Sequence, residues 1–113
     1  MPTIQVLHNP RCSKSRATLA LLEDNGVEYE VLEYLKRPFT TKNLKDISAK
    51  LGLKPSQFMR KGEFAKIGVE PATTEENILQ QMAEHPILVE RPIVINGDKA
   101  RIGRPPEAIL DIL

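Results

Sequence analysis

The sequence has no tryptophan and only five other aromatic residues, three Phe and two Tyr, among 113 residues. No apolar run approaches the roughly 18 residues that a membrane-spanning helix needs, and the start, MPTIQVLHNP, lacks the basic and then apolar plan of a signal peptide. Basic and acidic side chains nearly balance, at 16 and 15, so no global positive field favours nucleic acid. We therefore expect a small soluble protein with a core of Ile, Leu and Val and with no membrane or nucleic-acid partner.

Cysteine is nearly absent, because Cys12 is the only one in the chain. A single thiol cannot form an internal disulfide, and an unpaired thiol is typical of a reducing compartment, so we expect a cytoplasmic protein. The sequence also lacks the Cys and His spacing of a zinc site and the glycine-rich loop of a nucleotide site. We therefore expect no metal and no bound cofactor.

The first third of the chain predicts a strand, a helix and a second strand. The stretch TIQVLH alternates apolar and polar residues and is expected to end near His8, where an Asn-Pro pair breaks it. A helical pattern begins at Ser13, ends at an Asn-Gly pair, and places an apolar stripe at Ala17, Leu21 and Leu22. The segment VEYEVLEYL alternates again and indicates a strand joined to the first by a right-handed connection.

The middle of the chain, about residues 40–86, predicts helices only. A first helix begins at a Thr cap and ends at Gly52, and one or two short helices follow a cap at Ser56 and end at Gly68. The last helix of this stretch carries the capping-box spacing Thr73–Glu76.

The end of the chain predicts a hairpin and a closing helix. Asn96-Gly97 is a strong signal for a two-residue hairpin turn, and RPPEAILDIL has prolines in the first turn of a helix. The order β-α-β, helices, β-β-α is the thioredoxin-like arrangement. We predict one α/β domain over 1–113, with a thioredoxin/glutaredoxin-like core, a helical insertion at about 40–86 between the second and third strands, and a monomeric state.

The surroundings of Cys12 favour a thiolate. Cys12 falls at the strand-to-helix turn, and its neighbours in LHNPRCSKSR are cationic or protonatable: His8, Arg11, Lys14 and Arg16. Such neighbours and a helix start can lower a thiol pKa from ~8.5 to ~3.5–7.5. Ser13 and Ser15 offer hydroxyl donors to the sulfur or to an incoming oxyanion. The other interpretation is an inert small residue beside a solvated basic face, and the strand-to-helix placement together with the local positive charge favours the thiolate over it.

Four segments in the chain resemble, in order, those of the glutaredoxin-coupled arsenate reductases of the ArsC family. Cys12 with the following SKSR resembles the active-site segment, and FMRKGE resembles the segment that supplies an oxyanion-binding arginine, here Arg60. HPILVERPIVI and RIGRPPE are similar to the segments that supply two more, here Arg91 and Arg104. The resemblance implies that Cys12 is the nucleophile, that His8 supports thiolate formation, and that the three arginines bind the oxyanion.

The resemblance also implies a mechanism. The thiolate attacks arsenate, glutathione as co-substrate reduces the adduct to a mixed disulfide, and glutaredoxin as partner removes the glutathione. Ser15 joins the arginines as a substrate-binding residue. In thioredoxin-like folds the proline that opens the third strand is cis and faces the active-site cysteine, and Pro92 falls at that place.

Three alternatives stay open on the sequence. The Cys-x-x-Ser spacing of Cys12 and Ser15 also fits a glutathione-dependent thiol or disulfide reductase. An Spx-type regulator, which binds RNA polymerase without catalysis, shares the fold but usually carries Cys-x-x-Cys. Monothiol glutaredoxins that bind an iron–sulfur cluster have Cys-Gly-Phe-Ser, whereas this chain has Cys-Ser-Lys-Ser.

Overall fold

The computed structural model describes residues 4–9, 11–36 and 39–113. The chain divides into two compact units, one formed by Met1–Tyr34 with Arg91–Leu113 and the other by Leu35–Glu90. The predicted insertion of 40–86 falls inside the second unit. That the two units together form a single domain stays a prediction.

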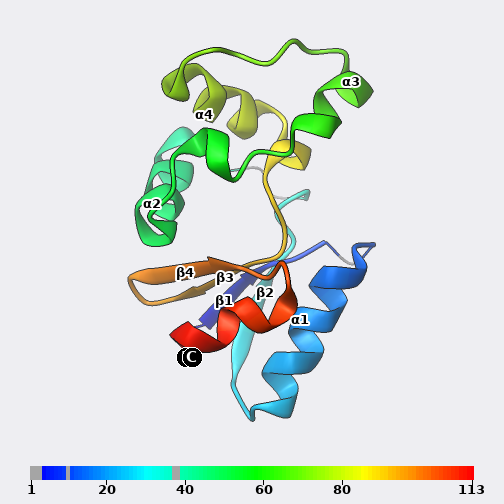
Figure 1. Ribbon diagram of the computed structural model, residues 1–113, viewed down its shortest axis with the longest axis vertical. Helices are drawn as coiled ribbons and strands as arrows, with labels where there is room; N and C mark the ends of the chain where they lie inside the picture. Colours follow the sequence, from blue (N-terminus) through cyan, green and yellow to red (C-terminus); the bar gives the residue numbers. More distant parts are fainter. Residues whose placement is uncertain (1–3, 10, 37–38) are drawn as a thin grey trace. The chain divides into compact units, whose positions relative to one another are not determined.

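The first unit contains a four-stranded sheet with the strand order β2-β1-β3-β4 (Figure 1). Strand β1 runs parallel to β2 and antiparallel to β3, and β3 forms a hairpin with β4. The predicted hairpin is present, but its turn lies one residue later than predicted, at Gly97 and Asp98, because Asn96 still pairs with Lys99. Of these residues only Gly97 has a positive φ, of 63°, as in a hairpin turn with glycine at the first central position. The strands comprise β1 at Ile4–Leu7, β2 at Tyr29–Leu32, β3 at Ile93–Asn96 and β4 at Lys99–Ile102.

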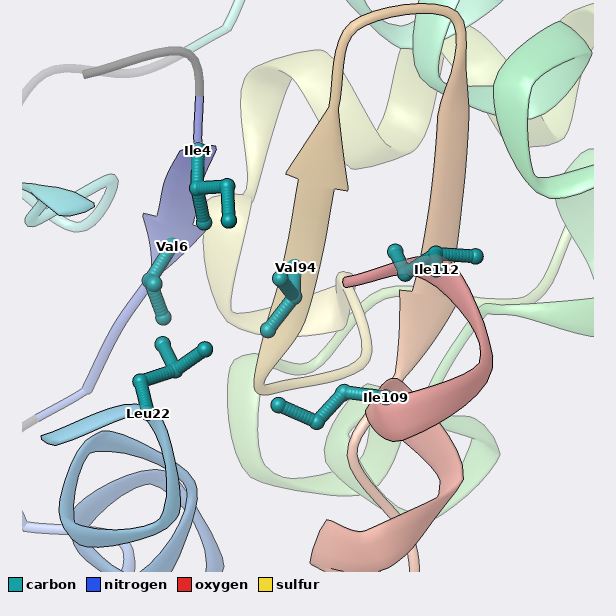
Figure 2. Packing of buried hydrophobic residues seen from close by; sticks show 6 residues of the cluster. All are labelled: Ile4, Val6, Leu22, Val94, Ile109 and Ile112. Carbon is teal, nitrogen blue, oxygen red and sulfur yellow. The ribbon is translucent and has the colours of Figure 1, made fainter. Parts of the chain in front are cut away.

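One face of this sheet is covered by α1 (Ser13–Asp24) and by η4 (Pro106–Ile112), which also contact each other. Figure 2 shows the side chains that meet there. Val6 and Val94 are paired across β1 and β3, so they point to the same face. The buried cluster consists of Ile4, Val6, Leu22, Val94, Ile109 and Ile112.

Two details of these helices differ from the prediction. The closing helix is a 3-10 helix rather than an α-helix. The buried face of α1 consists of Ser15, Thr18 and Leu22, whereas Ala17 is exposed. Hydrophobicity alone misplaced that face, because the two hydroxyl residues make hydrogen bonds that allow them to be buried.

The second unit is helical, as predicted. Its longer helices, α2 (Thr41–Leu51) and α4 (Glu75–Glu84), pack against each other. Thr40 caps α2 with a reciprocal pair of hydrogen bonds to Asn43. The shorter elements are η1 at Pro55–Gln57, η2 at Lys61–Glu63, α3 at Phe64–Ile67 and η3 at Pro86–Leu88. No helix in the described part of the chain is long and apolar enough to cross a membrane.

Two predicted caps in this unit are wrong. The cap of α4 is Thr74, whose hydroxyl accepts from the Asn77 N–H, rather than Thr73. Either threonine of the Thr-Thr pair could cap, and the extended backbone of Thr74 decides between them. Ser56 does not cap a helix but lies within η1, where its N–H and hydroxyl donate to Glu75. These bonds lower the pKa of the Glu75 carboxyl.

Truncation of Leu22 is expected to destabilise the first unit strongly. Leu22 is 0% exposed in the cluster between α1, the sheet and η4, so Leu22→Ala removes packing and leaves a cavity. We expect a loss of about 2–5 kcal/mol in the free energy of unfolding, measured by urea denaturation. The matched control is Leu110→Ala, because Leu110 is 43% exposed and should cost less than about 1 kcal/mol. Equal losses in the two variants would contradict the packing described.

Candidate active site

Cys12 is the N-cap residue of α1. Its backbone is extended, with φ −91° and ψ 122°, and its carbonyl accepts from the Arg16 N–H at 3.1 Å. The first turn of α1 contains no acidic residue. Unpaired N–H groups and the positive end of the helix dipole therefore act on the sulfur without a competing carboxylate.

The turn that carries Cys12 is organised by Asn9. The Asn9 carbonyl accepts from the Cys12 N–H at 3.0 Å, and its side-chain Oδ1 accepts from the Arg11 N–H at 3.0 Å. The Asn9 N–H donates to Ser15 Oγ at 3.4 Å. The sequence predicts Asn9 only as the end of a strand, although an asparagine side chain commonly accepts from the backbone N–H two residues ahead in such turns.

Hydrogen bonds lower the pKa of the Cys12 thiol. Burial raises it, but the Ser15 N–H, the Ser15 hydroxyl, the Lys14 N–H and the Arg91 side chain all donate to the sulfur and lower the pKa to about 7. Since Ser15 Oγ accepts from the Asn9 N–H, its own hydrogen remains available to the sulfur. At pH 7 about half of the Cys12 side chains are therefore thiolate.

Two of the three predicted arginines lie at the thiol. Arg104 Nη2 donates to Cys12 Sγ at 3.4 Å, and Arg104 Nε donates to the Arg91 carbonyl at 2.7 Å. The Arg104 guanidinium is thus held at both edges. Arg91, whose side chain also bonds the sulfur, is followed by the cis peptide bond expected at Pro92. A second cis bond, between Arg104 and Pro105, was not anticipated from the sequence.

His8 lies at the end of β1, is buried, and donates its backbone N–H to the Leu32 carbonyl at 3.0 Å. Burial lowers the pKa of its imidazole, Glu33 opposes this, and Arg16 adds to the lowering. Burial therefore favours the neutral imidazole over the positively charged form. Its part in thiolate formation stays a prediction.

Arg60 belongs to the second unit, where two carboxylates hold its guanidinium. Nη1 lies 2.9 Å from Glu90 Oε1, and Nη2 lies 3.6 Å from Oε1 of the buried Glu63. The backbone is fixed as well, because the Arg60 N–H donates to the Leu88 carbonyl at 2.7 Å. The predicted association of Arg60 with Cys12 stays a prediction.

Together, Cys12, Ser15, Arg91 and Arg104 combine a nucleophile with fixed donors to an anion. Guanidinium groups stay charged at every working pH and can bind oxyanions through two parallel hydrogen bonds. Within the described residues no group of three or more His, Cys, Asp or Glu side chains could hold a metal ion. The arrangement therefore suits nucleophilic attack by sulfur on an oxyanion.

Comparison with known proteins shows the family to which this chain belongs. Residues 7–112 match the sequence model of the ArsC family. This chain belongs to the ArsC family. An arsenate reductase from Neisseria meningitidis is 44% identical to it and aligns over 100% of both chains. The uncharacterized protein YfgD of Escherichia coli is 45% identical, over 97% of this chain and 96% of that protein.

The solved structure of an arsenate reductase from Vibrio cholerae has a TM-score of 0.88 and 43% identity, with 97% of each chain covered. The predicted mixed α/β, thioredoxin-like fold is confirmed for this ArsC-family chain, with its four-stranded sheet.

Loss of the Ser15 hydroxyl is expected to raise the pKa of the Cys12 thiol. Ser15→Ala removes one donor to the thiolate, and one hydrogen bond corresponds to about one pKa unit. The thiolate fraction at pH 7 should then fall from about half to about a tenth. Thiolate absorbance in the ultraviolet, followed against pH, measures the midpoint. Ser13→Ala is the matched control, because Ser13 is exposed. An unchanged midpoint in Ser15→Ala would show that the Ser15 hydroxyl does not stabilise the thiolate.

Proposed function

We propose that this protein reduces arsenate to arsenite through a covalent intermediate on Cys12. The observation that carries the proposal is the 3.4 Å contact from Arg104 Nη2 to Cys12 Sγ, at a thiol with a pKa of about 7. A guanidinium in that position can bind an oxygen of a tetrahedral oxyanion while the sulfur attacks its central atom. Relatives named arsenate reductase, aligned over the full length of this chain, support arsenate as that oxyanion.

The first step forms the intermediate. The Cys12 thiolate attacks As(V), a sulfur–arsenic bond forms, and one arsenic–oxygen bond breaks, with the oxygen leaving as water after protonation. Arg91 and Arg104 bind the remaining oxygens and offset their negative charge. Ser15 and the N-terminal N–H groups of α1 keep the sulfur ionised before attack.

The second step needs an external thiol, because the chain has no second cysteine. A glutathione thiolate attacks the Cys12 sulfur, a disulfide bond forms, and the sulfur–arsenic bond breaks. Its electron pair stays on arsenic, which leaves as arsenite, and the two sulfurs are oxidised in balance. A glutaredoxin thiolate then attacks the glutathione sulfur of the mixed disulfide and releases the Cys12 thiolate.

We include Arg60 in the oxyanion site on the strength of its FMRKGE segment. Its pairing with Glu90 and Glu63 keeps the guanidinium ordered and its charge balanced before an anion arrives. We also propose that the protein is a monomer. We place it in the cytoplasm, since the unpaired Cys12 requires a reducing compartment to stay a thiol.

A thiol or disulfide reductase is the second candidate, because a thiol with a pKa of about 7 suffices for disulfide exchange. An Spx-type switch is less well supported: the position that would hold its second cysteine is the buried Ser15. Arsenate turnover separates these functions from the proposed one.

Cys12→Ser is expected to abolish arsenate reduction without unfolding the protein. The hydroxyl is a far weaker nucleophile at neutral pH, and no other thiol can replace it. Turnover is measured as arsenate-dependent NADPH oxidation with glutathione, glutaredoxin and glutathione reductase. Parallel reactions with thioredoxin and its reductase identify the reductant. Retained turnover in the folded variant would rule out the Cys12 mechanism, and turnover with thioredoxin alone would rule out the glutaredoxin step.

Arg91→Lys and Arg104→Lys are expected to impair arsenate turnover more than thiol reactivity. Lysine keeps the charge but loses the planar fork, and one charge-assisted hydrogen bond corresponds to about 10–100-fold in kcat/KM. Alkylation of Cys12 by neutral iodoacetamide should change much less, because that reaction binds no oxyanion. Arg60→Lys tests the third arginine in the same assays.

The matched control is Arg101→Lys, because Arg101 forms an exposed pair with Asp111 and should keep full turnover. If turnover and alkylation fall together, the arginines serve the thiolate rather than the substrate. If arsenate turnover survives in every arginine variant, the oxyanion does not bind where we place it.

A further inference from the structure

Gly103 lies at the tightest approach that any glycine of this chain makes. A Cβ at Gly103 would stand 2.6 Å from Thr18 Oγ1 and 2.8 Å from Pro92 Cγ, whereas a Cβ at each of the other five glycines would meet nothing within 4 Å. Two carbon atoms in optimal van der Waals contact are about 3.5–4.0 Å apart. Gly103 has no positive φ angle, so its backbone conformation is open to any residue. What the position requires is space.

Neither Thr18 nor Pro92 can move away from Gly103 without disturbing its own packing. Thr18 is 0% exposed, and its hydroxyl donates to the Lys14 carbonyl at 2.9 Å, which ties it to α1. Pro92 is a buried, rigid ring at the start of β3. The Gly103 N–H also donates to the Pro92 carbonyl at 2.9 Å, so the two backbones are already in direct contact. A methyl group at Gly103 must therefore displace the backbone itself.

Each of these three residues belongs to a segment that carries a residue of the site. Pro92 follows Arg91, Gly103 precedes Arg104, and Thr18 lies on the helix whose N-cap is Cys12. The close approach consequently sets how near the two arginine-bearing segments come to the start of α1. The 3.4 Å bond from Arg104 Nη2 to the sulfur leaves little tolerance for a shift.

We propose that Gly103 is a positioning residue for the thiol site: the absence of its side chain lets the two arginine segments close on α1, so that their guanidinium groups reach Cys12. Restoring an ordinary contact distance in Gly103→Ala would move these segments by on the order of 1 Å. Misplacement on that scale can cost about 100-fold in rate. The expected effect on arsenate turnover rests on the proposed function, whereas the expected effect on the pKa of the Cys12 thiol does not.

The test compares Gly103→Ala with Gly62→Ala. Gly62 also has no positive φ, and a methyl group there meets nothing within 4 Å, so it controls for the loss of glycine itself. Two quantities are measured in each variant: the thiol pKa of Cys12, by ultraviolet absorbance against pH, and kcat/KM for arsenate. We expect Gly103→Ala to raise the thiol pKa above about 7 and to lower kcat/KM at least about tenfold, with Gly62→Ala unchanged in both.

A second substitution separates positioning from general damage. Thr18→Ala removes the atom at 2.6 Å, so the effect of Gly103→Ala on the thiol pKa should be smaller in that background than in the wild type. If Gly103→Ala alone fails to fold, the double variant is compared with Thr18→Ala, and a higher thiol pKa in the double variant is expected from the remaining Pro92 contact.

An unchanged thiol pKa in folded Gly103→Ala, or in the double variant when only that one folds, would overturn the positioning role. An equal rise in pKa with and without Thr18 would overturn the steric explanation. A wild-type protein that does not reduce arsenate would refute the proposed function but would leave the pKa comparison intact. The two failures are therefore distinguishable.

Discussion

The hydrogen bonds that converge on the sulfur of Cys12 are the interaction on which the rest of this site depends. Burial by itself would keep the thiol protonated, and the donors from Ser15, Lys14 and Arg91 outweigh it. Two of these donors are the backbone N–H groups of Lys14 and Ser15, which can bond the sulfur because α1 begins immediately after Cys12 and its first N–H groups have no acceptor within the helix. The reactivity of the thiol therefore depends on the helix start and on the side chains of Ser15 and Arg91 as well as on the cysteine itself.

Close packing also holds the segments that carry Arg91 and Arg104. Arg91 and Arg104 flank the hairpin of β3 and β4. Their segments are joined by the hydrogen bond from Arg104 Nε to the Arg91 carbonyl and by the contact of Gly103 with Pro92. A densely packed interior deforms little, so a displacement at one of these contacts is passed to its neighbours rather than absorbed. The positioning role that we propose for Gly103 would act on the guanidinium groups of Arg91 and Arg104 in this way.

Much of the fold could be predicted because its signals are local. The alternation in TIQVLH and VEYEVLEYL predicted strands β1 and β2. The Asn-Gly pair predicted the hairpin, although the turn itself lies one residue later, at Gly97 and Asp98. Errors arose where neighbours in sequence are chemically equivalent. Thr73 and Thr74 can both cap a helix, and the α1 face at Thr18 is buried although Ala17 is the more apolar residue.

For the site, the sequence by itself determined which groups are available: one thiol, a strand-to-helix turn that carries it, and arginines in segments that resemble those of the ArsC family. The tertiary structure decided which groups meet. The bond from Arg104 to Cys12 spans 92 positions, and the space that Gly103 leaves exists only after α1 and β3 have packed. Local sequence encodes the φ and ψ preferences of a few adjacent residues. Contacts across the chain depend on the volume and hydrogen bonds of every residue between the packed elements, which no single segment contains.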